Sequence, residues 1–227
     1  MRRRQVLGLG AAALPTALAG CTSSGGLGGR EDTEPSTATS TPTPTPTRSP
    51  SPSPSPSPTP AGTPVEVVSR DDQPDVPVEY EVAMAERLAT DEHPARIVVT
   101  IRNPTDSAVV LGEERAVRFH HVRSGDGTLY LLPAGGRVEE FADPGCWRLT
   151  DGVAIATYYG TVAIPADGSI GAESYVLGST DLPESACLPS GEHRVVTSGR
   201  AAASAESVLG GGDDVTDFEW GFTLRVG

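Results

Sequence analysis

The sequence predicts an all-β fold, a β-sandwich, for residues 64–227 of the 227-residue chain. Three observations lead to this prediction. Short apolar runs recur along this region and are separated by turn-forming residues. Asp-Gly, the residue pair favoured by two-residue hairpin turns, lies between such runs at 126–127 and 167–168, and 151–152 is a third candidate. Only residues 200–209, which are rich in alanine and precede Gly210, have a helical composition.

The first expected strand covers residues 78–84, where Val78, Tyr80 and Val82 alternate with mostly polar side chains. Residues 96–102 form the next, and we expect it to end at the Asn-Pro-Thr-Asp turn at 103–106, since proline fixes φ and Asn and Asp bond their own backbone. Further strands are expected at residues 109–111, 116–122, 128–132, 153–159, 161–164, 174–177, 193–197 and 218–226. Many short strands with little helix are typical of a β-sandwich, and about 164 residues suffice for one hydrophobic core.

Residues 1–20 have the features of an export signal. Arg2, Arg3 and Arg4 precede an apolar run, residues 6–18, that is too short for the roughly 30 Å hydrocarbon core of a membrane. Residues 3–7 (Arg-Arg-Gln-Val-Leu) resemble the twin-arginine (Tat) signal, which implies export in the folded state.

The sequence Leu-Ala-Gly-Cys at 18–21 resembles a lipobox, the motif that precedes a lipid-bearing cysteine. The resemblance implies that Cys21 becomes a lipidated N-terminus. A single lipid chain binds membranes only marginally, so stable attachment implies a two-chain modification. A simple secretory signal followed by a chance cysteine is the alternative interpretation.

Residues 21–63 are predicted to be a disordered linker behind the lipid. Thr-Pro and Ser-Pro repeats fill residues 41–60, and such a segment can bury no core. Alternating proline favours extended polyproline II at about 3.1 Å per residue. We therefore expect a stalk that lifts the domain off the membrane, and its Ser/Thr/Pro composition suggests O-glycosylation.

The charge balance excludes several functions. All 17 basic residues are arginine, so no P-loop, Schiff-base or Ser-Lys chemistry that needs lysine is possible. The 30 acidic residues make nucleic acid an unsuitable partner, because such binding needs a basic face. An acidic, lysine-free composition resembles that of proteins from halophilic archaea, in which salt screens the repulsion between carboxylates. A high-GC bacterial source is the alternative explanation for arginine in place of lysine.

Two cysteines remain after Cys21, namely Cys146 and Cys187. An even pair in an exported protein predicts one disulfide bond. On the chain-entropy description, closing a loop of about forty residues would stabilise the fold by roughly 4 kcal/mol. A free thiol pair and a metal site are the competing interpretations.

No common catalytic or metal motif is present in the sequence. His120 and His121 are adjacent in an expected strand and should point to opposite faces, His121 with Val117 and Phe119, so they cannot share one metal. Cys187 with His193 resembles the Cys and His of a copper cupredoxin, but the only methionine after Met1 lies far upstream. Acidic clusters that could hold calcium, or else form solvated surface, lie at 71–75, 113–114, 139–140 and 213–217.

The order of these segments, with an Asn-Pro-Thr turn, a late Pro-Ser-Gly-Glu-His-Arg-Val stretch at 189–195 and a final aromatic strand, resembles the immunoglobulin-like modules of archaeal and bacterial surface lipoproteins. With the Tat-like signal and the lipobox, this resemblance implies a lipid-anchored surface lipoprotein of a halophilic archaeon. The expected function is a non-catalytic binding or structural module on the extracellular face of the cell membrane, with an envelope protein or glycan as partner and no cofactor. The alternatives are an anchored enzyme, a calcium- or copper-binding protein, and a protease inhibitor that acts through a loop.

Overall fold

The structure is a computed structural model that describes residues 62–155 and 158–227. All of these residues belong to one unit, residues 55–227. The expected signal peptide, the lipidation site Cys21 and most of the stalk lie outside the described residues. No helix in the described part of the chain is long and apolar enough to cross a membrane.

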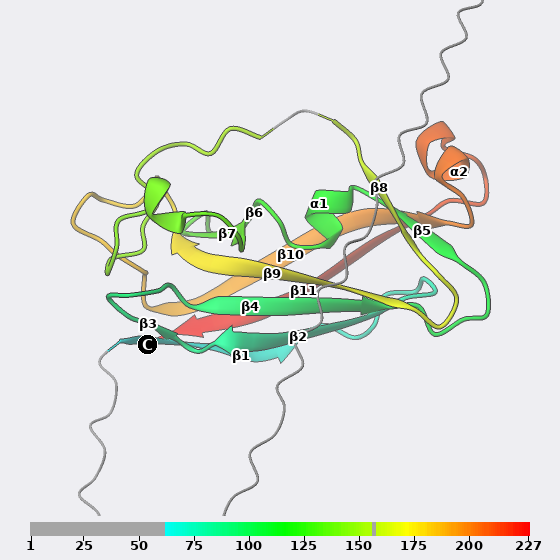
Figure 1. Cartoon of the computed structure of the whole chain (residues 1–227). Coiled ribbons are helices and arrows are strands. Elements are labelled where there is room, and N and C mark those ends of the chain that lie inside the picture. Colours follow the sequence, from blue (N-terminus) through cyan, green and yellow to red (C-terminus); the bar gives the residue numbers. More distant parts are fainter. Residues whose placement is uncertain (1–61, 156–157) are drawn as a thin grey trace, which may run out of the picture. The chain divides into compact units, whose positions relative to one another are not determined.

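Two antiparallel β-sheets form the domain, which confirms the prediction of an all-β sandwich (Figure 1). The six-stranded sheet consists, in spatial order, of β3 (Leu88–Ala89), β1 (Thr63–Arg70), β11 (Thr216–Val226), β10 (Gly191–Ala202), β5 (Val109–Gly112) and β8 (Thr161–Ile164). The five-stranded sheet consists of β2 (Glu79–Glu86), β4 (Arg96–Arg102), β9 (Ser169–Gly178), β7 (Leu129–Pro133) and β6 (Val122–Arg123). Three short helices, α1 (Glu114–Val117), the 3₁₀-helix η1 (Val138–Glu140) and α2 (Ala205–Gly210), lie in the connections.

Alternation along the strands builds the core between the sheets. In β11, Trp220, Phe222 and Leu224 are fully buried and point inward, while Glu219 before them and Arg225 after them face solvent. The ring of Trp220 stacks on Tyr80 of β2 at 4.7 Å between centroids. Burial of each such large side chain stabilises the fold by roughly 1.5–3 kcal/mol, and offset aromatic pairs add to this.

The prediction of a strand at residues 116–122 is wrong. Residues 114–117 form α1, and Phe119 and His121 then adopt left-handed backbone conformations with φ of 58° and 60°. The two bends bury Phe119 completely among the core aromatics, with its ring edge-on to Trp220 at 5.8 Å. Packing of this one ring therefore overrides the local β propensity, and only β6 at residues 122–123 remains extended.

The strand expected at residues 153–159 is also wrong: none of its described residues, 153–155 and 158–159, is in a strand. A strand needs a partner. β8 pairs with β5 only from Thr161 to Ile164, because β5 ends at Gly112 and the chain turns into α1. The preceding apolar residues consequently lie in the long connection between β7 and β8.

The helix expected at residues 200–209 begins later than predicted. Ala201 and Ala202 continue β10 and pair with Leu111 and Val110 of β5, so strand pairing overrides the helix propensity of alanine. α2 starts after Ser204, whose side chain accepts a hydrogen bond from the backbone of Ser207, and ends at the left-handed Gly211.

Only one of the three Asp-Gly pairs considered as hairpin turns forms a hairpin. Residues 126–127 form the turn of the β6–β7 hairpin, as predicted, with Gly127 at φ 74°. Residues 167–168 make a tight turn with Asp167 at φ 53°, but it joins β8 and β9, which belong to different sheets. The hairpin predicted there is therefore wrong, and so is the candidate at 151–152, which lies in the β7–β8 connection.

Candidate ligand pocket

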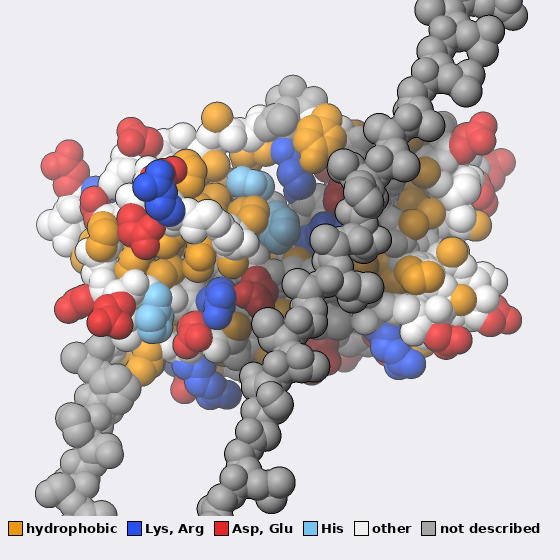
Figure 2. All heavy atoms as spheres, in the orientation of Figure 1, with side chains coloured by type: hydrophobic (Ala, Val, Ile, Leu, Met, Phe, Trp, Pro, Cys, Tyr) orange, Lys and Arg blue, Asp and Glu red, His pale blue; other side chains and the backbone are white. Residues whose placement is uncertain are grey.

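The acidic clusters singled out in the sequence lie at separate places on the domain, and Figure 2 shows carboxylates spread along the rim of one face. Several of their members pair with arginine: Asp71 with Arg194, Glu114 with Arg118 at 3.3 Å and Glu140 with Arg137. Among the described residues, no group of three or more His, Cys, Asp or Glu side chains is close enough to hold a metal ion. Two cluster members, Glu113 and Asp217, instead meet in one pocket.

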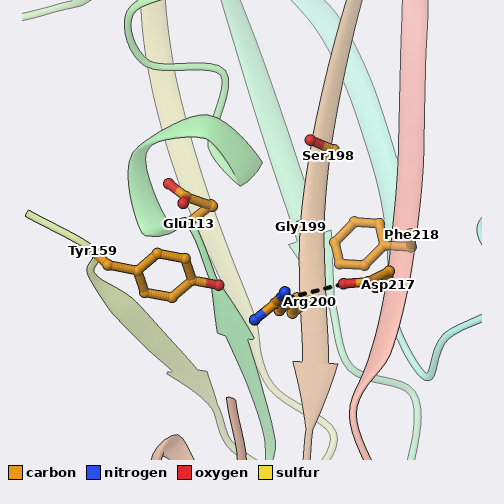
Figure 3. Close-up of a pocket in the computed structure, with 7 residues that line it drawn as sticks. All are labelled: Glu113, Tyr159, Ser198, Gly199, Arg200, Asp217 and Phe218. Carbon is orange, nitrogen blue, oxygen red and sulfur yellow. Dashed lines mark hydrogen bonds and ion pairs between the residues drawn. The ribbon is translucent and has the colours of Figure 1, made fainter. Parts of the chain in front are cut away.

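This pocket has a volume of about 380 Å³ and is lined by residues of four separate segments (Figure 3). Glu113 lies between β5 and α1, and Tyr159 lies at the end of the β7–β8 connection. The remaining lining residues come from two neighbouring strands: Ser198, Gly199 and Arg200 from β10, and Asp217 and Phe218 from β11. Side chains far apart in the sequence therefore converge on one volume.

Glycines make room for this arrangement. A Cβ atom at Gly112 would lie 2.2 Å from Oη of Tyr159, so the phenol can reach its position only because residue 112 has no side chain. A Cβ atom at Gly199 would lie 2.5 Å from Cγ1 of Val117 and 2.9 Å from Cζ of Phe218. Both contacts are shorter than real Cβ contacts, so a glycine at each position allows the close approach that shapes the pocket.

Strand register and backbone strain position the charged groups. Arg200 and Asp217 are directly opposite in the β10–β11 ladder, and Nε of Arg200 donates a hydrogen bond to Oδ1 of Asp217 at 3.0 Å (Figure 3). Glu113 has a left-handed backbone with φ 55° and ψ 48°. Such a conformation costs about 1 kcal/mol or more for a residue other than glycine, and it is concentrated at functional sites.

The phenol of Tyr159 points from its loop toward Arg200 (Figure 3). Burial raises the pKa of Tyr159, and the charges of Glu113 and Asp217 raise it further, while Arg200 opposes them. The phenol therefore remains a hydrogen-bond donor at neutral pH. The pocket thus combines two carboxylates, one guanidinium and two hydroxyl groups with an aromatic edge from Phe218.

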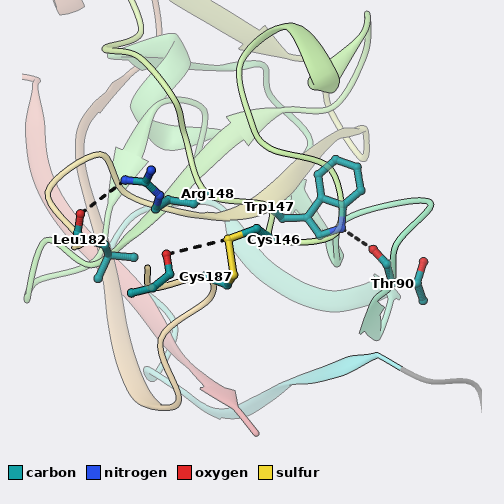
Figure 4. The surroundings of a disulfide bond; sticks show 7 residues. Thr90, Cys146, Trp147, Arg148, Leu182 and Cys187 are labelled. Carbon is teal, nitrogen blue, oxygen red and sulfur yellow. Dashed lines mark hydrogen bonds between the residues drawn. A yellow bond between two sulfur atoms is a disulfide. The ribbon is translucent and has the colours of Figure 1, made fainter. Parts of the chain in front are cut away.

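The two predicted disulfide partners are bonded to each other: Cys146 joins Cys187 across a sequence separation of 41 residues (Figure 4). The bond ties the β7–β8 connection to the β9–β10 connection. Next to it, Trp147 is 1% exposed, and its indole donates a hydrogen bond to the carbonyl of Thr90 (Figure 4). Because Cys187 is oxidised, its sulfur is unavailable as the thiolate ligand of a copper site.

The histidines form no common site. His193 is 5% exposed, with Nδ1 at 2.8 Å from Oδ2 of Asp126 and Nε2 at 3.0 Å from the carbonyl oxygen of Pro189. The strand prediction placed His121 on one face with Val117 and Phe119, and this is wrong. Val117 and Phe119 are buried, whereas Nδ1 of His121 lies 3.2 Å from the hydroxyl of Tyr130.

His120 has its pKa lowered to about 4 by burial and by the neighbouring charges of Arg118 and His121. Its imidazole is therefore neutral at physiological pH.

A second, larger hollow of about 580 Å³ lies beneath the β7–β8 connection. Apolar groups make up most of its lining, among them Leu132, Pro133, Phe141 and Val153, and the side chains of His121, Glu140 and Asp151 also line it. Phe141 is 43% exposed, and in the same connection Tyr158 is 56% exposed. The lining of this hollow is more apolar than that of the smaller pocket.

Sequence reasoning missed most of the pocket. It noted Glu113 and Asp217 only as members of acidic clusters, and it did not mark Ser198, Arg200 or Tyr159. The sequence gives only a weak signal for the pocket. Arg200 and Asp217 are 17 residues apart, and they meet only if their two strands pair in one particular register, which the sequence does not determine.

A comparison of the chain with protein-family models, curated proteins and solved structures found no match.

Proposed function

We propose that the chain is a lipid-anchored module of the cell envelope whose sandwich domain binds a ligand outside the cell and performs no chemistry. The observation that carries the proposal is the sequence of the first 21 residues: three arginines, an uncharged apolar run and the lipobox-like motif that ends at Cys21. This order of features is that of an exported lipoprotein. The extracellular face is then the place where the domain acts.

Two properties of the domain support this location and role. The Cys146–Cys187 disulfide suits an oxidising compartment outside the cytoplasm. The pocket between Glu113, Tyr159 and Arg200 offers hydrogen-bonding groups with which a ligand could be bound.

Membrane fractionation tests the anchor. In a haloarchaeal host, the precursor carrying Cys21→Ser should move from the membrane fraction to the soluble fraction or the medium, because no acceptor for the lipid remains. The matched control is Ser24→Ala, which changes a residue close behind the anchor but keeps Cys21 and should stay in the membrane fraction. If Cys21→Ser also stays in the membrane fraction, the proposed anchor is refuted.

A further inference from the structure

We infer that the pocket formed by Glu113, Tyr159, Ser198, Arg200, Asp217 and Phe218 binds a neutral sugar residue. The inference rests on the proposed function of the domain as a binding module, and it names the ligand of that module. Three properties of the pocket carry it: the sign and placement of its charges, its pattern of donors and acceptors, and its size.

The lining carries charges of both signs, so an ionic ligand of either sign would meet a like charge. Glu113 and Asp217 give the lining two carboxylates against the single guanidinium of Arg200, so an anion would be repelled. A cation would have to approach Arg200, which faces the centre of the pocket between the phenol of Tyr159 and Asp217 (Figure 3). An apolar ligand would bury these charged groups without partners, which costs several kcal/mol. A neutral polar ligand remains.

The donors and acceptors match a ligand rich in hydroxyl groups. Asp217 uses one oxygen to bind Nε of Arg200, and in the described part of the chain the terminal nitrogens of Arg200 make no hydrogen bond. They can therefore donate to a ligand, as can the phenol of Tyr159, while the carboxylate of Glu113 accepts. A sugar hydroxyl both donates and accepts, so adjacent hydroxyls can bridge such neighbouring groups. The ring of Tyr159, which is 39% exposed, can cover the C–H face of the sugar.

The size agrees with one or two sugar rings. The pocket volume of about 380 Å³ lies near the lower end of the range for small-molecule sites, roughly 300–1,000 Å³. Tyr159 is 39% exposed, so one side of the pocket is open to solvent. A sugar at the end of a longer glycan could therefore enter.

Ligand-observed NMR with the full-length chain in detergent tests the inference. The neutral ligands are the methyl α- and β-glycosides of glucose, galactose, mannose and N-acetylglucosamine. Glucuronate and galacturonate replace a neutral group by an anion, and glucosamine and galactosamine replace one by a cation, on rings of the same size. We expect at least one neutral glycoside to bind, with a Kd of about 1 mM as for weak ligands, and at least tenfold more tightly than its charged counterparts.

Variants connect any binding to this pocket. The double variant Arg200→Ala/Asp217→Ala should weaken binding at least tenfold, and Tyr159→Phe and Glu113→Gln should each weaken it several-fold. The matched control is Arg225→Ala/Glu192→Ala, which removes another exposed β10–β11 ion pair, with N···O at 2.7 Å, outside the pocket. This control should bind normally, and near-ultraviolet circular dichroism should show that all variants fold.

Several results would overturn the inference: no binding of any neutral glycoside at 20 mM, binding of uronates or amino sugars as tight as that of neutral sugars, or unchanged binding by the Arg200/Asp217 variant. Such results leave the anchor untouched, because membrane attachment through Cys21 is measured separately. Conversely, sugar binding by a chain that keeps its membrane attachment after Cys21→Ser would refute only the anchor.

Discussion

At the scale of single residues, Asp126 holds several segments together. Its carboxylate accepts hydrogen bonds from the hydroxyl and backbone N–H of Thr128 and from Oγ of Ser124, and its Oδ2 lies 2.8 Å from Nδ1 of His193. The other ring nitrogen of His193, Nε2, lies 3.0 Å from the carbonyl oxygen of Pro189. The β6–β7 turn is thereby connected through β10 to the loop that follows Cys187.

These contacts predict a pH-dependent stability. Desolvation by itself raises the pKa of Asp126, but hydrogen bonds from Ser124, Thr128 and His193 outweigh it and hold the pKa well below its usual value. A carboxyl group whose pKa is lower in the folded state stabilises the fold above its unfolded pKa of about 3.9, and this contribution is lost as the pH falls through the folded pKa. Asp126→Asn should therefore lower the free energy of unfolding at pH 7 by about 1 kcal/mol, a value reduced for the partial exposure of the carboxylate.

Urea unfolding between pH 2.5 and pH 7 measures this difference. The gap between the unmodified chain and Asp126→Asn should be constant at neutral pH and should shrink below about pH 4. Asp72→Asn, which replaces an exposed aspartate outside the ion pairs of the described residues, should behave like the unmodified chain. A gap that is absent at pH 7, or that widens in acid, would contradict the role assigned to Asp126.

At the scale of elements, the edge strand β2 is covered by side chains. The amide of Gln73 donates to the carbonyl of Tyr80 at 3.0 Å and accepts from its N–H at 2.6 Å, as a neighbouring strand would. Arg70 donates twice to the carbonyl of Val82, at 3.2 and 2.7 Å. Exposed edge strands tend to pair with other chains, so these contacts protect the sheet from association.

Removing this cover should promote association. We expect the double variant Arg70→Ala/Gln73→Ala to shift toward dimers or larger species relative to the unmodified chain, because it frees the N–H and C=O groups of β2. Sedimentation velocity at equal concentrations measures the shift. Arg102→Ala serves as the control, since it removes an exposed arginine that pairs with Glu79 but leaves the edge covered. An unchanged size distribution in the double variant would show that the edge needs no such protection.

The elements also show what sequence can and cannot predict. β4 at 96–102 and β8 at 161–164 have the predicted bounds, because their alternation is local and strong. The strands expected at 116–122 and 153–159 failed for non-local reasons, namely the burial of Phe119 and the lack of a partner strand beyond Gly112. The pocket was largely unpredictable for the same reason. It depends on the β10–β11 register and on a long loop that returns to β5.

At the scale of the whole molecule, the excess of acidic groups sets the dependence on solvent. The chain has 30 acidic residues and 17 arginines, and several of its carboxylates form exposed ion pairs such as that of Glu173 with Arg96. Exposed pairs contribute little each, whereas a large net charge destabilises the compact state through self-repulsion. Salt reduces both effects, with a Debye length of about 10 Å at 0.1 M and about 3 Å at 1 M. Repulsion dominates here because negative charges outnumber positive ones.

The domain should therefore become more stable as salt is added. We expect the midpoint of thermal unfolding to rise by several degrees between 0.1 and 2 M KCl, measured by circular dichroism. The comparison variant neutralises Asp72, Asp75, Glu139, Asp143 and Asp213, exposed acids that take part in no ion pair between described residues, by replacement with Asn or Gln. It should be more stable than the unmodified chain in 0.1 M KCl and should gain less from added salt, since less repulsion remains to be screened. Equal gains in both chains would show that KCl acts through general exclusion from the protein surface, and a midpoint that falls with salt would show that the ion pairs outweigh the repulsion.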